Sequence, residues 1–108
     1  LLFETFAISL AAHNDTIAKR AVTLGGLALG TARHVAQHSR LPEYDQKVTR
    51  DMEHVRLLAD RLEAYLTGLR ESRGVGEKLG DTDTVDLLTG IISEFEKHAW
   101  FLRASLEG

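Results

Sequence analysis

Apolar residues recur every three or four positions along three long stretches of the chain, which is the spacing of amphipathic α-helices and not of strands. The second stretch contains Met52, Val55, Leu58, Leu62, Tyr65, Leu66 and Leu69, preceded by Val48. The third contains Val85, Leu88, Ile91, Ile92, Phe95, Ala99, Phe101, Leu102 and Leu106. The pattern predicts helices at about 1–24, 46–72 and 83–106, hence an all-α, up-and-down helical bundle.

Glycine, threonine and proline mark the end of the first long helix and a short helix after it. Gly25 and Gly26 follow the last periodic residue, and glycine there adopts the left-handed conformation that closes a helix. Thr31 is placed to cap a connector helix at about 32–39, and Pro42 prevents its extension. We therefore expect three long helices and one short one.

A second break is expected between the last two long helices. Gly74, Gly76 and Gly80 alternate with charged residues, a composition typical of loops. Asp81 or Asp83 then stands where a side chain caps the following helix. The second long helix should therefore end near residue 72.

The composition indicates one domain, covering residues 1–108. The chain has one Pro, no Cys and 44% hydrophobic residues, with 13 basic against 16 acidic side chains. Nucleic-acid-binding modules normally show a basic excess, which is missing here. The absence of Cys suits a reducing compartment, so we expect a cytoplasmic protein, and no apolar run reaches the roughly 18 residues of a membrane span.

Size and the start of the sequence give two further expectations. A domain of this length hides only about 60 to 70% of the surface that its unfolded chain exposes, so oligomerisation would add usefully to the buried area. The helical pattern is already running at Leu1 without a capping residue before it. We therefore expect the natural chain to extend upstream.

Three sequence elements resemble the Dps family (DNA-binding protein from starved cells), miniferritins of the ferritin-like superfamily. They are HNDTIAKR at 13–20, LGG at 24–26 with the Gly-Thr pair at 30–31, and DTVDLLT at 83–89 leading into EKHAWFL at 96–102. In the family, an Asp-x-x-x-Glu-Arg element precedes Leu-Gly-Gly, and a Thr-Ala-Asp-Leu-Leu-Thr-like motif opens the last helix. The resemblance covers essentially the whole chain. It starts partway along the family's second helix, so the first helix and its histidine ligands would lie upstream of Leu1.

The resemblance implies a ferritin-like four-helix-bundle fold, here as three long helices plus a connector. It also implies a homo-oligomeric shell, a dodecamer, in which ferrous iron is oxidised, preferentially by hydrogen peroxide, at sites shared across two-fold interfaces. Iron storage and protection against peroxide would follow, making the chain a ferroxidase-type oxidoreductase. Many family members also bind DNA.

Glu4 and Asp15 are the candidate iron ligands and catalytic residues. They are eleven residues apart, and eleven helical steps return to within about 20° of the same face. Inward-facing carboxylates of this kind build di-iron sites in helical bundles. Spacing alone leaves open that both are ordinary solvated acids, whereas the resemblance places both on acidic ligand positions.

Lys19 stands where the resemblance expects the Glu that binds the second metal. A protonated ammonium cannot ligate and repels a divalent cation. Lys19 lies one turn after Asp15, so it should pair with that acid or fill the second metal's position electrostatically. The alternative is a lysine that simply points to solvent.

An acidic cluster opens the last helix. Asp81, Asp83 and Asp86 lie where caps and the helix dipole already favour acids. The resemblance implies that this region lines three-fold pores, where carboxylates would concentrate cations and guide iron inward. Asp86 is the best pore candidate because it belongs to the motif itself.

Three histidines have simpler interpretations than catalysis. His34 and His38 are spaced i, i+4 and could share a metal, but no Glu follows His34 as a zinc-protease motif requires. His98 lies one turn after Glu94, so packing or pairing is the favoured reading.

Trp100 and Phe101 fall within the apolar stripe and indicate core or interface rather than a base-stacking platform. Family DNA binding often depends on Lys-rich extensions, and neither end of this sequence carries one. DNA binding therefore has no local support.

Two further functions compete with iron oxidation. One is a Dps-derived structural or DNA-compacting shell whose ferroxidase centre is impaired, and Lys19 is its main support. The other is a generic helical interaction domain whose first helix comes from a partner chain. The mass of the assembly and its uptake of iron under peroxide would separate the three.

Overall fold

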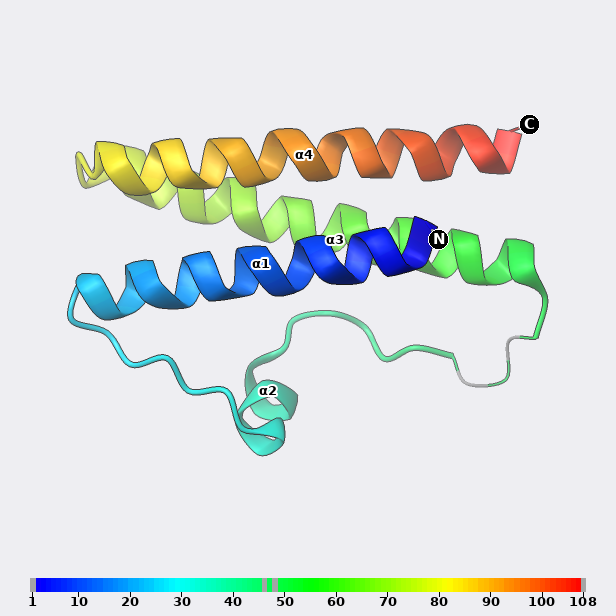
Figure 1. Cartoon of the computed structure of the whole chain (residues 1–108), viewed down its shortest axis with the longest axis horizontal. Coiled ribbons are helices and arrows are strands. Elements are labelled where there is room, and N and C mark those ends of the chain that lie inside the picture. The colour runs from blue at the N-terminus through cyan, green and yellow to red at the C-terminus, as the bar shows by residue number, and fades with distance from the viewer. Residues whose placement is uncertain (1, 46, 48, 108) are drawn as a thin grey trace. The chain divides into compact units, whose positions relative to one another are not determined.

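The computed structural model describes residues 2–45, 47 and 49–107 and contains four helices (Figure 1). They are α1 (Leu2–Thr23), α2 (Ala32–His38), α3 (Asp51–Lys78) and α4 (Thr82–Glu107). No strand occurs in this part of the chain. The all-α prediction, with three long helices and one connector, is confirmed.

The chain divides into two compact units, residues 1–40 and residues 41–108. We call the first the N-terminal segment, which contains α1 and α2. The second is the hairpin unit, which contains α3 and α4. Across residues 2–45, 47 and 49–107, no helix is long and apolar enough to cross a bilayer.

The hairpin unit is held by an apolar seam between α3 and α4, which lie side by side along their lengths (Figure 1). Its buried residues are Ala59, Leu62, Leu66, Leu69, Leu88, Ile91, Ile92, Phe95, Ala99 and Leu102. Phe95 is completely buried and meets the ring of Tyr65 edge-on, with centroids 5.6 Å apart. Burying one such side chain stabilises the fold by about 1.5–3 kcal/mol. The predicted stripes therefore supply all of these core residues except Ala59, whereas Met52 and Phe101 of the stripes are exposed.

Polar contacts across the hairpin confirm that the two helices run antiparallel. Arg70 donates to the Glu96 carboxylate at 2.9 Å, and Arg103 pairs with Glu63. Glu63 precedes Arg70 in α3, whereas its partner Arg103 follows Glu96 in α4, as antiparallel helices require. These pairs are exposed, so each adds at most about 1 kcal/mol to stability.

The prediction that α3 ends near residue 72, with a loop at Gly74 and Gly76, is wrong. The helix continues to Lys78 and ends in a Schellman motif: Gly80 has φ 71°, and the Asp81 N–H donates to the Gly76 carbonyl at 2.9 Å. Gly76 is buried, and a Cβ there would lie 3.2 Å from Val85 Cγ2. Glycine at 76 therefore serves close helix packing rather than a turn.

The start of α3 also differs from the prediction. We expected the helix from about 46, whereas α3 begins at Asp51, after an Arg50 in extended conformation. The Asp45 carboxylate accepts the Lys47 N–H at 2.9 Å, and this local turn competes with helix. The predicted first residue of the helix and Val48 lie outside the described residues.

Both predicted boundaries in the N-terminal segment are confirmed. Gly25 has φ 89°, and the Gly26 N–H donates to the Ala21 carbonyl at 2.8 Å, which closes α1 with a second Schellman motif. Thr31 caps α2, since its hydroxyl oxygen accepts the His34 N–H at 3.3 Å. The helix ends at His38, one residue before the predicted end.

Two aromatic residues of α4 do not belong to its core. Trp100 is 60% exposed and Phe101 is 51% exposed, and their rings contact each other edge-on. The neighbouring Ala99 and Leu102 take the buried positions, because one residue of helix turns the side chain by about 100°. The core interpretation of this pair is wrong, and an interface remains a prediction.

Candidate metal-binding face

The candidate ligands Glu4 and Asp15 lie on one face of α1, which is helical without interruption from Leu2 to Thr23. Eleven residues of helix place them within about 20° of each other around the axis and about 16 Å apart along it. Ligand distances to a metal are about 2–2.6 Å, so one ion cannot bridge the two carboxylates of the same helix. Each acid on this face needs ligands from elsewhere.

The face that carries the acids also exposes apolar side chains. Ile8 and Val22 lie within about 20° of Asp15 around the helix, and they are 67% and 57% exposed. Ile17 lies about 160° away, on the opposite side. The acidic face is therefore mixed, with carboxylates set among exposed hydrophobic groups, and not a purely solvated polar face.

Asp15 is already engaged by Lys19, as one of the two sequence interpretations of this lysine predicts. The Lys19 Nζ lies 2.7 Å from Asp15 Oδ2, and both side chains are largely exposed. A hydrogen bond to Asp15 and the attraction of its negative charge raise the pKa of Lys19 above its ordinary value. Lys19 thus stays cationic at neutral pH, and a metal ion at Asp15 would have to displace it or tolerate it.

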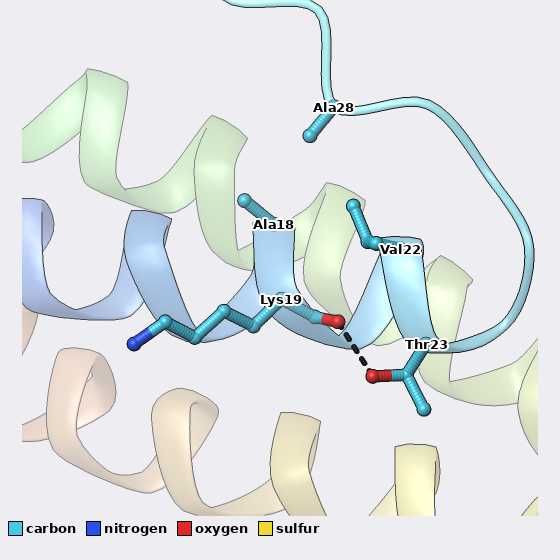
Figure 2. Close-up of a pocket in the computed structure, with 5 residues that line it drawn as sticks. All are labelled: Ala18, Lys19, Val22, Thr23 and Ala28. Atoms are coloured by element: carbon cyan, nitrogen blue, oxygen red, sulfur yellow. Dashed lines mark hydrogen bonds between the residues drawn. The ribbon is translucent and has the colours of Figure 1, made fainter.

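An open hollow of about 520 Å³ lies beside the end of this face. Figure 2 shows its lining, in which the methyl groups of Ala18, Val22 and Ala28 gather on one side while Lys19 extends away along the helix. Thr23 also lines the hollow, and it donates its hydroxyl to the Lys19 carbonyl at 2.8 Å. Neither Glu4 nor Asp15 lines this hollow, and nothing in the sequence spacing predicted it.

No preformed metal cage exists in residues 2–45, 47 and 49–107, where no three His, Asp or Glu side chains are grouped suitably. The structure thus brings Glu4 and Asp15 to one face without bringing them together.

The acidic cluster of α4 splits into two roles. Asp81 caps the helix: its carboxylate accepts the Thr84 N–H at 3.2 Å and the Thr84 hydroxyl at 2.5 Å. Asp83 lies in the first turn, and the side chains of Asp83 and Asp86 are exposed. The capping interpretation is confirmed for Asp81, whereas the pore role of all three acids remains a prediction.

The sequence interpretation of His98 is also confirmed. Its Nε2 lies 3.5 Å from Glu94 Oε1, and its ring packs edge-on against Phe95 at 5.2 Å. His98 therefore supports the hairpin core, and we assign it no part in a metal site.

Comparison with known proteins places the chain in a family. The sequence profile of the ferritin-like domain matches residues 1–108. The "DNA protection during starvation protein" of Agrobacterium fabrum is 32% identical over 106 residues, which cover 98% of this chain and 65% of that protein. The "DNA protection during starvation protein 2" of Bacillus anthracis is 34% identical, covering 96% of this chain and 70% of the relative.

A solved structure confirms the fold. The antigen TpF1 of Treponema pallidum superposes with a TM-score of 0.93 at 24% identity, covering 99% of this chain and 69% of that one. The chain thus spans about two thirds of the length of these relatives. Together with the four-helix architecture, these matches show that the chain belongs to the Dps family of miniferritins, which have the ferritin-like fold.

Proposed function

We propose that this chain assembles with copies of itself into a Dps-type shell that oxidises ferrous iron with hydrogen peroxide and stores the ferric product. The observation that carries the proposal is the mixed face of α1. It presents Glu4 and Asp15 about 16 Å apart among the exposed side chains of Ile8 and Val22. A second subunit that covered the apolar groups would also supply the ligands that each acid lacks.

Antiparallel pairing of two such faces would cover the exposed apolar side chains and would also supply further ligands to each acid. In a two-fold arrangement, Glu4 of one subunit meets Asp15 of its partner, and the reverse holds at the other end, because such contacts are reciprocal. Two equivalent sites would result, separated by the spacing of the acids along α1. Oxygen ligands from carboxylates suit ferrous and ferric iron.

Oxidation at this site would need little from the protein beyond holding iron near the oxidant. One peroxide takes an electron from each of two ferrous ions, accepts two protons and leaves as two water molecules. Asp15 and Glu4 would hold iron through carboxylate oxygens, and their negative charge would favour the higher ferric charge. The mineral would then grow from the ferric product inside the shell.

A weakened centre is the second candidate function, and the Asp15–Lys19 pair favours it. The ammonium occupies Asp15 at 2.7 Å and offers no lone pair at the position where a Glu would add ligands. Such a shell would serve in assembly, sequestration or DNA compaction. The relatives are named for DNA protection, and this chain could protect DNA by removing iron and peroxide without touching it.

The test is peroxide-driven oxidation of ferrous iron by the wild type, Asp15→Asn and Asp60→Asn. Asp60 is an exposed acid on α3, so its replacement is the matched control for the loss of one charge. We expect Asp15→Asn to lower the initial rate about tenfold or more, the scale of losses seen when a metal site is damaged, and Asp60→Asn to leave it unchanged. Equal rates in all three proteins would contradict a role for Asp15.

Light scattering tests the assembly on which the site depends. A closed oligomer much heavier than a dimer is expected, since the proposed shell needs several kinds of contact. A monomer whose mass is independent of concentration would contradict both the shell and the two-subunit site.

A further inference from the structure

We propose that His34 and His38 on α2 form a second metal site, which binds a late first-row divalent cation such as Zn²⁺, Ni²⁺ or Cu²⁺. The two histidines are one helical turn apart, and α2 is helical from Ala32 to His38. Residues spaced i, i+4 have Cβ atoms about 5–6 Å apart on one face, which allows two imidazoles to reach one ion. This is the spacing that the zinc-binding helices of metalloproteases use.

One contact of His34 matches a feature of metal-binding histidines. Thr31 Oγ1 lies 2.6 Å from His34 Nδ1 and also accepts the backbone N–H of His34. Nδ1 is therefore engaged, and Nε2 would be the ligating nitrogen in the proposed site. In the tautomer that ligates through Nε2, Nδ1 carries the proton and donates it to Thr31 Oγ1. The existing contact then becomes the outer-shell hydrogen bond that fixes a metal-binding histidine.

The capping of α2 and the orientation of the ligand thus depend on the same threonine hydroxyl. α2 has no buried residue, so its conformation rests on this cap and on its own hydrogen bonds. A cation held between His34 and His38 would cross-link one turn of a short helix, which is marginal on its own. Metal binding should therefore also make α2 more resistant to unfolding.

The donor set determines which metals the site selects. Two imidazole nitrogens with water in the remaining positions suit Zn²⁺, Ni²⁺ and Cu²⁺, and affinity for Fe²⁺ is lower in the same series. Arg33 adds a repulsion that water and salt screen, because it is exposed and about 100° around the helix from His34. The site shares no residue with the face of Glu4, Asp15 and Lys19, so it does not depend on the proposed function.

The experiment compares Zn²⁺ binding by calorimetry in the intact wild-type protein and in the double variant Ala36→His/His38→Ala. The double variant keeps the composition of α2 but moves the second imidazole to i+2, about 200° around the helix from the first. The wild type should bind one Zn²⁺ per chain with at least about tenfold higher affinity than the double variant. Far-UV circular dichroism of the two proteins without metal should be the same, since both positions are exposed.

Two further arms keep the result decisive. Thr31→Ser retains the hydroxyl and should bind Zn²⁺ as the wild type does, whereas His34→Ala should lose the site. Ni²⁺ should compete for the site, and Fe²⁺ at the same concentration should not displace Zn²⁺. Equal Zn²⁺ affinity in the wild type and the double variant, or undiminished affinity in His34→Ala, would overturn the proposal whatever the outcome of the iron-oxidation experiments.

Discussion

The hairpin unit and the N-terminal segment differ in what their helices bury. α3 and α4 enclose a continuous seam in which Leu66 and Phe95 are almost or completely inaccessible. On α1, by contrast, the face with the candidate ligands leaves Ile8 and Val22 more than half exposed and holds Asp15 in a surface ion pair. Most of the buried core residues thus lie in the hairpin, while the proposed iron chemistry depends on a face of α1 that a second subunit covers in the proposed assembly.

This division separates two kinds of mutation. A change in the hairpin seam should lower the free energy of unfolding whatever the state of assembly. A change on the acidic face of α1 should alter iron chemistry and leave the folding of the chain nearly unaffected, because exposed side chains contribute little to it.

The largest expected effect is on stability in the hairpin. Phe95→Ala should lower the free energy of unfolding by about 3–5 kcal/mol, because the side chain is completely buried and would leave a cavity. Phe101→Ala, on the same helix but half exposed, should cost less than about 1 kcal/mol in the unassembled chain. Urea denaturation of the two variants measures the difference. Similar losses in both would show that the seam does not dominate stability.

The second prediction concerns iron uptake through the acidic residues at the start of α4, in the hairpin unit. Asp83→Asn/Asp86→Asn should slow iron uptake by up to about tenfold at low salt, since the proposed pore would lose its attraction for cations. Asp81 is left intact because it caps α4. Stopped-flow measurements at low and high salt check this, and the effect should shrink as the Debye length falls below about 10 Å. Uptake equal to that of Asp51→Asn/Asp60→Asn, which alters two acids of α3, would confine these residues to a structural role.

Two glycines of α3 provide a finer test of the packing between α3 and α4. Gly74→Ala should raise the free energy of unfolding by about 0.5–1 kcal/mol, because a Cβ there meets no atom and alanine favours helix. Gly76→Ala gains the same helix propensity but must push Val85 away from 3.2 Å. Thermal unfolding should rank Gly74→Ala above Gly76→Ala. The reverse order would mean that the two helices are less closely packed at Val85 than the structure indicates.

The smallest effect concerns alkaline pH. Burial raises the pKa of Tyr65 above its ordinary value of 10.0, since the ionised phenolate is disfavoured beside Phe95. The raised pKa means that the folded state holds the proton more tightly than the unfolded state. The resulting stability is complete below pH 10 and is lost as the pH rises through the folded-state value. Tyr65→Phe should unfold with a weaker dependence on pH above 10, and an identical dependence would exclude this contribution.

The sequence predicted the number and the order of the helices, because periodic apolar residues and capping residues agree with each other. It failed at Gly74 and Gly76, where close packing against Val85 overrides the low helix propensity of glycine. It also placed Phe101 in the apolar stripe, as a core or interface residue, although Ala99 and Leu102 fill the core positions. Periodicity identifies an apolar face but cannot show which part of it the same chain covers.

The candidate site was only half predictable for a similar reason. Helical spacing is local information, so the shared face of Glu4 and Asp15 and the pairing of Asp15 with Lys19 follow from residue numbers. Asp81 was one of two possible caps, and only the structure distinguishes it from Asp83. Local spacing cannot identify the further ligands of each acid, because in the proposed arrangement a second subunit supplies them.

The central claim is that the α1 face binds iron and that Lys19 limits its capacity. The most direct measurement is an anaerobic titration of the intact protein with ferrous iron, followed by addition of peroxide. It compares the wild type with Lys19→Glu and with Lys19→Gln, which removes the positive charge without adding a carboxylate ligand. We predict that Lys19→Glu binds more ferrous ions per chain and oxidises them faster than both other proteins. Equal stoichiometry and equal initial rates in all three proteins would contradict the claim.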